Sequence, residues 1–201
     1  GNEGGGSGSG SSPIRPFLFG EPKRSGQWKE SGPLARRFRG SEEVKVDAKG
    51  RVSIPAKFRR VFESCDPDWD TGKRAQLVIV YGTRDWNYLQ LFTMTAMEEI
   101  EDGISRMPRG SAARNLLENI YQGHADEAEI DGDGRLVLPQ KLREKIGLTD
   151  SAFFISAGDS LKVWNPAAYA DEERRLEELV PEFEPGADPL SLLTPSGGAE
   201  V

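Results

Sequence analysis

The sequence has very few of the residues on which disulfides, zinc sites and nucleophilic catalysis depend. Its 201 residues include one cysteine, Cys65, and one histidine, His124. A single cysteine excludes an internal disulfide and suits a reducing compartment. Ser-His-Asp or Cys-His catalysis would depend on His124 alone, and a zinc site would lack its usual ligands. We therefore expect no enzyme activity, cofactor or metal, and we interpret Cys65 as a small apolar side chain and His124 as an exposed loop residue.

The sequence also lacks a long apolar run. A membrane-spanning helix needs roughly 20 consecutive apolar residues, and no stretch of the chain approaches that length. We therefore expect a soluble, cytoplasmic protein that does not bind membranes. The Gly/Ser composition of residues 1–12 is typical of a flexible linker. We interpret residues 1–35 as a disordered leader, tag or linker, and residues 181–201, which are acidic and rich in Pro, Gly and Ser, as a disordered tail.

The charge is distributed unevenly along the chain. The formal net charge of −7 is unusual for a protein that binds nucleic acid, but residues 171–201, with nine acids and two arginines, account for all of it. Residues 33–62 hold nine basic side chains and three acids. A basic segment of this kind is typical either of a solvated surface or of a surface that contacts phosphate. The acidic tail could compete with nucleic acid for that segment.

One pattern of residues occurs twice, 84 positions apart. Residues 46–59 read VDAKGRVSIPAKFR, and residues 130–143 read IDGDGRLVLPQKLR. They align without a gap, and Asp, Gly, Arg, Pro and Lys recur at the same positions. Later segments align with an offset of 72, so the first copy carries 12 extra residues, which we place around residues 64–73. The sequence therefore predicts two similar halves, residues 36–108 and 109–180.

The spacing of apolar residues predicts an α+β fold. Each half is expected to contain two short strands, a helix, two further strands and a final helix. In the first half these are residues 43–47, 51–54, 55–62, 77–81, 88–92 and 94–107. In the second half they are residues 127–131, 135–138, 139–146, 152–156, 161–164 and 166–179. A helix over residues 111–121 is expected between them.

The turn inside the first copy combines an aspartate, a glycine and an arginine. Asp47 ends a strand, where its carboxylate can accept hydrogen bonds from the amides of the turn. Gly50 can adopt the positive φ that the reversal needs. Arg51 then begins the return strand close to Asp47. Such an arginine either closes the turn by an ion pair or is held at the tip of the turn for a phosphate or a base edge, and the residues alone leave both functions open.

The second copy has the same turn with a less basic composition. Asp131 and Gly134 support it as Asp47 and Gly50 support the first, but Asp133 stands where the first copy has Lys49. We therefore expect the first turn to be the better anion site. The candidate DNA contacts are Lys49, Arg51, Arg135, Arg37, Arg39, Lys57 and Arg59.

The doubled motif resembles the MraZ family. The resemblance rests on Asp47–Arg51 and Asp131–Arg135, each followed by an apolar-x-apolar-Pro sequence, and on FRG at Phe38–Gly40, which is similar to the start of the family's chains. It covers about residues 36–180. It implies two tandem AbrB/MraZ-like swapped-hairpin repeats of the double-split β-barrel type, with peripheral helices.

The resemblance also implies a function. Members of this family are sequence-specific, DNA-binding transcriptional regulators, which act on direct repeats upstream of the division and cell-wall gene cluster. The implied partners are double-stranded DNA and further copies of the chain, in an octamer-like, ring-shaped homo-oligomer associated with the nucleoid. In such a ring, several modest contacts can act together on repeated sites. No small-molecule substrate is implied.

Three other functions are weighed against this one. An assembly or adaptor protein that forms a ring without binding DNA would use the helices at 94–121 and 166–180 as contacts. A calcium loop at residues 129–140 would have three acidic ligands, but glutamine stands where a bidentate glutamate is needed. An enzyme based on carboxylate pairs would use residues 98–102 or 171–178, where the acids instead have the spacing of solvated helix faces.

Overall fold

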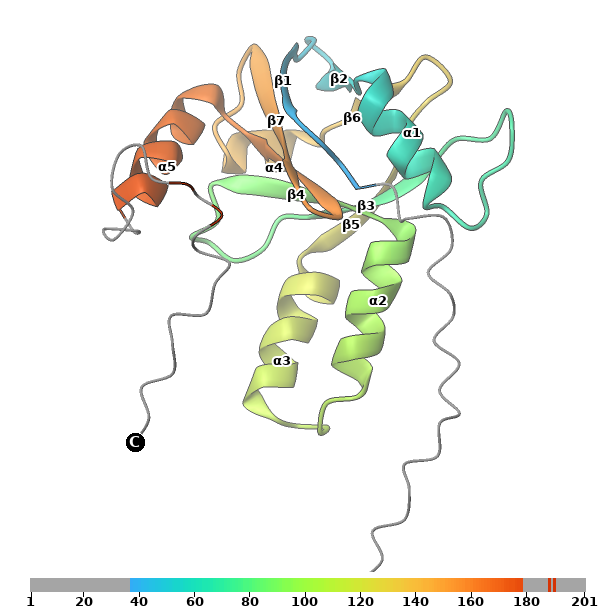
Figure 1. The fold of residues 1–201 in the computed structure, drawn as a ribbon, viewed down its shortest axis with the longest axis vertical. Coiled ribbons are helices and arrows are strands. Elements are labelled where there is room, and N and C mark those ends of the chain that lie inside the picture. Colours follow the sequence, from blue (N-terminus) through green and yellow to red (C-terminus); the bar gives the residue numbers. More distant parts are fainter. Residues whose placement is uncertain (1–36, 179–187, 189, 191–201) are drawn as a thin grey trace, which may run out of the picture. The chain divides into compact units, whose positions relative to one another are not determined.

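The computed structural model describes residues 37–178, 188 and 190 (Figure 1). The first half contains β1 (Ser41–Lys45), β2 (Arg51–Ser53), α1 (Ala56–Ser64), β3 (Gln76–Val80), β4 (Tyr88–Thr93) and α2 (Met94–Ser105). Next come α3 (Ala112–Glu118) and the short π-helix η1 (Asn119–Gly123). The second half contains β5 (Ala125–Glu129), β6 (Arg135–Val137), α4 (Gln140–Lys145), β7 (Ser151–Ala157), β8 (Ser160–Trp164) and α5 (Pro166–Glu178). The expectations of disorder for residues 1–35 and for most of 181–201 lie outside the described residues.

The predicted α+β class is confirmed, and the described elements begin and end close to their predicted limits. Two details differ. The helix expected over residues 111–121 ends at Glu118 and continues as the π-helix η1. The 12 extra residues of the first half are also spread more widely than predicted. They lengthen α1, the loop at residues 65–75 and the connection at residues 81–87.

The strands form a six-stranded sheet and a separate two-stranded ribbon. The sheet has the order β1-β7-β8-β4-β3-β5, and all its pairs are antiparallel. The ribbon consists of β2 and β6. The first strand of each half pairs with a strand of the other half, since β1 pairs with β7 and β5 with β3. Each half therefore depends on the other for its outer strand.

The main core lies between one face of the sheet and the ribbon with α1 and α4. In α1 the buried residues Phe58, Val61 and Phe62 have the i, i+3, i+4 spacing of an amphipathic helix. The ribbon contributes Val52 and Leu136, which are fully buried in the same core. Burying a side chain of this size contributes about 1.5–3 kcal/mol. The ribbon is therefore fixed to the core by its inward face.

Helices α2 and α5 cover the opposite face of the sheet. In α2, Ala96 and Met97 pack in a second apolar cluster with Val78 of β3 and Phe92 of β4. In α5, the ring of Tyr169 lies 4.5 Å from that of Phe153 in β7. Helices α2 and α3 contact each other and lie side by side in Figure 1, where the pair projects from the β3–β4–β5 part of the sheet.

Two expectations about single residues can be compared with the structure. His124 lies in a turn, as predicted, but is half-buried rather than fully exposed: its Nδ1 lies 2.8 Å from the carbonyl oxygen of Asn119 and its ring stands edge-on to Tyr81. Cys65 is half-buried against the main core, as expected for an apolar side chain. Across the part of the chain that the structure describes, none of the helices has both the length and the apolar character needed to span a bilayer.

Candidate nucleic-acid interface

The first turn is closed by the side chain of Asp47. Its Oδ1 accepts hydrogen bonds from the backbone N–H groups of Lys49 and Arg51, each at 2.9 Å, and its Oδ2 accepts one from Nε of Arg51 at 2.6 Å. Gly50 has a φ of +77°, as the reversal requires. The backbone and side-chain bonds from Arg51 hold the pKa of the Asp47 carboxyl below its ordinary value of 3.8. The carboxylate is therefore ionised at neutral pH, and the ion pair is present.

The second turn has the same backbone geometry but a different side-chain pairing. Oδ1 of Asp131 accepts bonds from the N–H groups of Asp133 and Arg135, at 3.0 Å and 2.8 Å. The Arg135 guanidinium, however, binds Oδ2 of Asp133 through Nη1 at 3.1 Å. Each arginine is thus paired with an aspartate, but Asp133 adds a negative charge to the second turn where Lys49 adds a positive charge to the first.

The two turns lie at opposite ends of the β2–β6 ribbon. Arg51 is opposite Val137 and Ser53 is opposite Arg135, with the buried pair Val52 and Leu136 between them. Because side chains alternate along a strand, Arg51, Ser53, Arg135 and Val137 share the outward face, and the two arginines are about 7 Å apart along the strand direction. We call these four residues the ribbon face. Val137 is 53% exposed.

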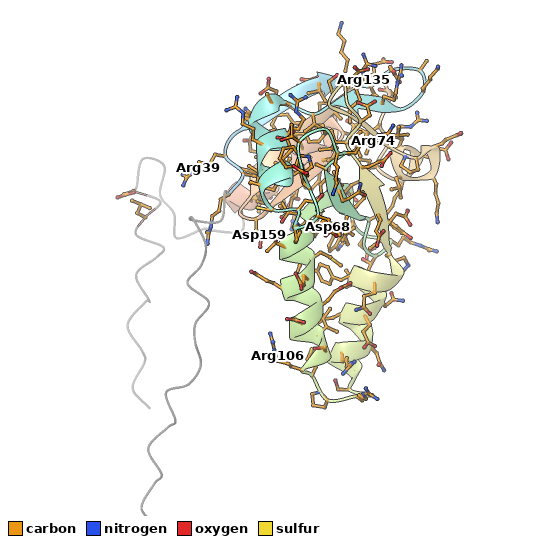
Figure 2. All side chains as sticks on the ribbon, turned by 90° about the vertical axis from the view of Figure 1, so that its right-hand side faces the viewer. Arg39, Asp68, Arg74, Arg106, Arg135 and Asp159 are labelled. Carbon is orange, nitrogen blue, oxygen red and sulfur yellow. The ribbon has the colours of Figure 1, made fainter. Side chains whose placement is uncertain are left out.

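The remaining candidate cations lie elsewhere. Nζ of Lys57 is 2.8 Å from Oε2 of Glu42 and donates to the carbonyl of Ser41, so it binds the start of β1 rather than the turn. Arg37 and Arg39 are exposed residues that precede β1, and Figure 2 shows Arg39 well apart from Arg135. The structure therefore brings Lys49, Arg51 and Arg135 to the ribbon, but not these three residues.

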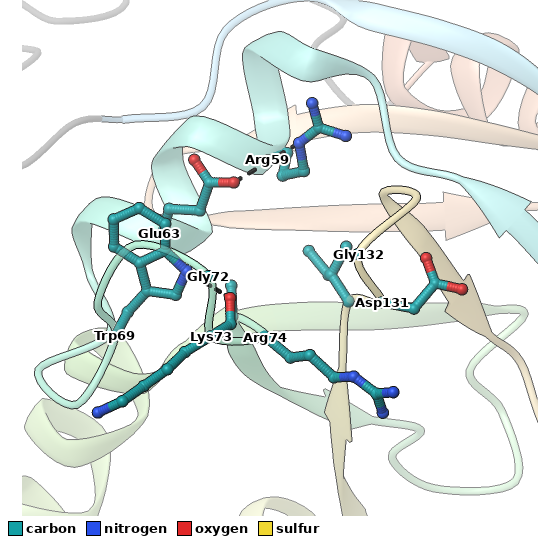
Figure 3. Close-up of a pocket in the computed structure, with 10 residues that line it drawn as sticks. Arg59, Glu63, Trp69, Gly72, Lys73, Arg74, Asp131 and Gly132 are labelled. Carbon is teal, nitrogen blue, oxygen red and sulfur yellow. Dashed lines mark hydrogen bonds and ion pairs between the residues drawn. The ribbon is translucent and has the colours of Figure 1, made fainter.

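Arg59 lies beside the second turn, in the wall of a pocket of about 410 Å³ (Figure 3). The pocket is formed by α1, the loop at residues 65–75 and the turn at Asp131. The two arginines that line the pocket each form an ion pair with a glutamate. Arg59 lies 3.6 Å from Glu63, and Arg74 binds Glu129. The sequence did not indicate that Arg74 lines a pocket with the second turn, because Arg74 lies in the additional loop of the first half. The polar side chains of Arg59, Glu63 and Arg74 that line the pocket therefore lie near the second turn.

The calcium-loop alternative gains no support from the described residues. Among residues 37–178, 188 and 190, no group of three or more His, Cys, Asp or Glu side chains is close enough together to hold a metal ion. In the segment considered as a calcium loop, both Asp131 and Asp133 accept hydrogen bonds from the turn itself.

These features define an α+β protein in which two similar halves build one antiparallel sheet and display a two-stranded ribbon. The sequence model of the family described as "MraZ protein, putative antitoxin-like" matches residues 37–119 and 122–184. The chain belongs to the MraZ family, which confirms the resemblance found in the sequence.

Relatives from several bacteria match most of the chain. A protein of Ruegeria pomeroyi named "Transcriptional regulator MraZ" is 48% identical over 167 residues, which cover 83% of this chain and 100% of the relative. A protein of the same name from Cereibacter sphaeroides is 44% identical over 171 residues, 82% of this chain and 99% of the relative. One from Coxiella burnetii is 32% identical over 151 residues, 75% of this chain and 93% of the relative.

Proposed function

We propose that this chain is a sequence-specific DNA-binding transcriptional regulator that acts on direct repeats upstream of the division and cell-wall gene cluster. The names of its relatives support the regulatory role. The observation that carries the DNA-binding role is the ribbon face, because a two-stranded ribbon fits the major groove of B-DNA. This face presents two arginines and an exposed valine, while its inward residues are fixed in the core.

Arg51 is the residue proposed to read a base. Asp47 accepts the hydrogen of Nε, and neither Nη atom of Arg51 has a hydrogen-bond partner among the described residues. Both Nη groups are therefore available for the bidentate contact that arginine makes with O6 and N7 of guanine. The exposed Lys49 at the tip of the same turn supplies a phosphate contact, which contributes affinity but no sequence information.

The two halves are proposed to be swapped-hairpin repeats over residues 36–108 and 109–180. The pairing of β1 with β7, of β5 with β3 and of β2 with β6 supports this, since each of these pairs joins a strand of one half to a strand of the other. Such an arrangement gives a single chain two similar turns on one ribbon. One chain can then contact DNA at two points, with the first turn as the stronger.

Self-association is a further part of the proposal. Leu116 of α3 is 56% exposed and Leu176 of α5 is 50% exposed. These apolar side chains support contacts between copies in an octamer-like ring, which would be cytoplasmic and associated with the nucleoid. A ring would place several ribbons on repeated DNA sites at once, and the combined affinity would exceed that of one ribbon.

The proposal is tested by fluorescence anisotropy with two DNA probes. The upstream duplex spans the region immediately before the gene for this chain, and the scrambled duplex has the same length and base composition. We expect tighter binding to the upstream duplex, with an affinity that falls steeply as salt rises, because phosphate contacts release counterions. Absence of binding to either duplex at low salt, by protein that light scattering shows to be assembled, would favour the adaptor function instead.

A further inference from the structure

Each turn glycine packs against an arginine of the other half. A Cβ added to Gly50 would lie 2.6 Å from Nε and 2.9 Å from Cζ of Arg143. A Cβ added to Gly134 would overlap Nη1 of Arg59 and lie 3.1 Å from its Cζ. Arg59 in α1 and Arg143 in α4 occupy the same position of the repeated pattern. The helix of each half thus places a guanidinium directly against the turn of the opposite half.

Arg143 is also connected to the first turn by hydrogen bonds. Its Nε donates to the carbonyl of Leu138 at 3.0 Å, and the N–H of Leu138 donates to the carbonyl of Gly50 at 2.8 Å. Gly50 is buried and directly precedes Arg51. Arg143 therefore packs against the backbone of the first turn at Gly50. It also binds Leu138, whose N–H donates to the carbonyl of Gly50.

The equivalent arginine of the first half has a different partner. Arg59 lies 3.6 Å from Oε1 of Glu63, whereas the position that corresponds to Glu63 in the second half is Gly147. Arg143 consequently has no acidic residue one turn further along its own chain. Its hydrogen bond goes instead to Leu138, next to the more basic of the two turns.

We propose that Arg143 is a positioning residue for DNA reading by the first turn, and that it acts from the second half without contacting DNA. This inference rests on the proposed DNA-binding function. A residue that reads a base must be held to within about 0.5 Å of its productive position by the residues around it. Arg143 fills the space against Gly50 and keeps the backbone of Arg51 in place. Without it, Arg51 keeps its ion pair with Asp47, but the whole turn can shift on the ribbon.

Positioning and phosphate contact have different experimental signatures. A cation that contacts phosphate adds affinity for any DNA, and its removal lowers the slope of log affinity against log salt by about 1. A positioning residue changes the preference for the upstream duplex over the scrambled duplex and leaves that slope unchanged. Lysine at position 143 separates the two, because it keeps the charge but loses Nε–H and the planar group beside Gly50.

The experiment compares Arg143→Lys, Arg143→Ala and Arg51→Ala with the unaltered chain, using both duplexes over a range of salt. Arg60→Ala is the matched control, since it removes one positive charge from an exposed position of α1. We expect both Arg143 variants to lose about tenfold in preference, the order of one base-reading contact, with unchanged affinity for the scrambled duplex and an unchanged salt slope. Arg60→Ala should keep the preference.

Full preference in Arg143→Lys, with a lower salt slope in Arg143→Ala, would make Arg143 a phosphate contact and overturn the inference. Circular dichroism and light scattering show whether each variant is folded and assembled. If Arg143→Ala does not fold, the preference of Arg143→Lys for the upstream duplex is sufficient to test the inference, because this variant retains the aliphatic part of the side chain. Loss of preference in Arg51→Ala but not in Arg143→Lys would overturn this inference and leave the proposed function standing. An unaltered chain without any preference would overturn the proposed function itself.

Discussion

The guanidinium of Arg51 donates through Nε to Oδ2 of Asp47 over 2.6 Å. The corresponding pair in the second half, Arg135 and Asp131, is not joined in this way, because Arg135 binds Asp133. Two turns with the same backbone hydrogen bonds therefore hold their arginines differently. We therefore expect the two turns to differ in their contribution to stability and in DNA binding.

The ion pair of Asp47 predicts a pH dependence of stability. The pKa of Asp47 is lowered in the folded chain, so the ionised carboxylate contributes stability above its ordinary pKa of 3.8, and this contribution is lost as the pH falls through the folded value. Asp47→Asn should destabilise the fold at neutral pH and lose less of its stability on acidification. Urea unfolding at neutral pH and below pH 3.8 measures both effects.

Asp131→Asn is the matched control for that comparison. Asp131 accepts the same two backbone bonds, but its side chain does not bind the guanidinium of Arg135. We expect a smaller loss at neutral pH for Asp131→Asn than for Asp47→Asn. Equal losses, or an unchanged pH profile in Asp47→Asn, would show that the ion pair does not stabilise the first turn.

The close packing of Gly50 predicts a large cost for alanine at this position. Gly50 and Gly158 have φ values of +77° and +74°, but only at Gly50 would a Cβ meet atoms within 4 Å. Gly158→Ala should lower the free energy of unfolding by about 1–2 kcal/mol through its backbone conformation alone. Gly50→Ala should cost roughly 1–3 kcal/mol more, the usual range for overpacking. Equal values from urea unfolding would mean that the contacts with Arg143 and with the carbonyl oxygen of Leu138 are readily relieved.

Arg114 is expected to stabilise the α2–α3 pair. Its Nη1 donates to the carbonyls of Ser105 and Met107 at the end of α2, and its Nε binds Glu118 at 2.7 Å. Arg114→Ala should destabilise the fold by about 1.5–3 kcal/mol, the range for hydrogen bonds to a charged group. The control is Arg106→Ala, which alters an exposed arginine near the end of the same pair (Figure 2). An equally small change in melting temperature for both variants would contradict this role.

The exposed leucine of α3 gives a prediction for assembly. We expect light scattering to give a mass above that of a dimer at micromolar concentration. Leu116→Ser should reduce that mass and leave the melting temperature of the dissociated chain almost unchanged, because Leu116 is 56% exposed in the single chain. An unaltered chain that is monomeric at this concentration would contradict the proposed self-association.

Much of the local structure followed from the sequence, because it depends on neighbouring residues. Gly50 predicted the reversal, and Phe58, Val61 and Phe62 predicted the buried face of α1. The order of the strands could not be predicted in the same way. Ser41 pairs with Ile155, more than a hundred residues later, and no periodic pattern specifies which strand becomes its neighbour.

The site was predictable only where one short segment contains it. The residues from Asp47 to Arg51 lie within one turn, so an ion pair between them was among the expected possibilities. Lys57 was grouped with them because it is close in sequence, but its side chain points to Glu42. The contact of Arg143 with Gly50 joins residues of different halves, which charge patterns along the chain do not indicate.

The most direct test of the account compares Arg51→Ala with Arg135→Ala in binding to the upstream duplex, with light scattering to confirm that both variants assemble. Both side chains lie on the ribbon face and both are paired with an aspartate. Arg51 binds Asp47 through Nε and stands next to Lys49, whereas Arg135 binds Asp133 through Nη1. We expect Arg51→Ala to lose about tenfold or more in affinity, the order of one base-reading contact, and Arg135→Ala to lose clearly less. Equal losses would show that the two turns contact DNA alike. Unchanged affinity of an assembled Arg51→Ala variant would contradict the account and leave Arg51 with the structural role of closing its turn.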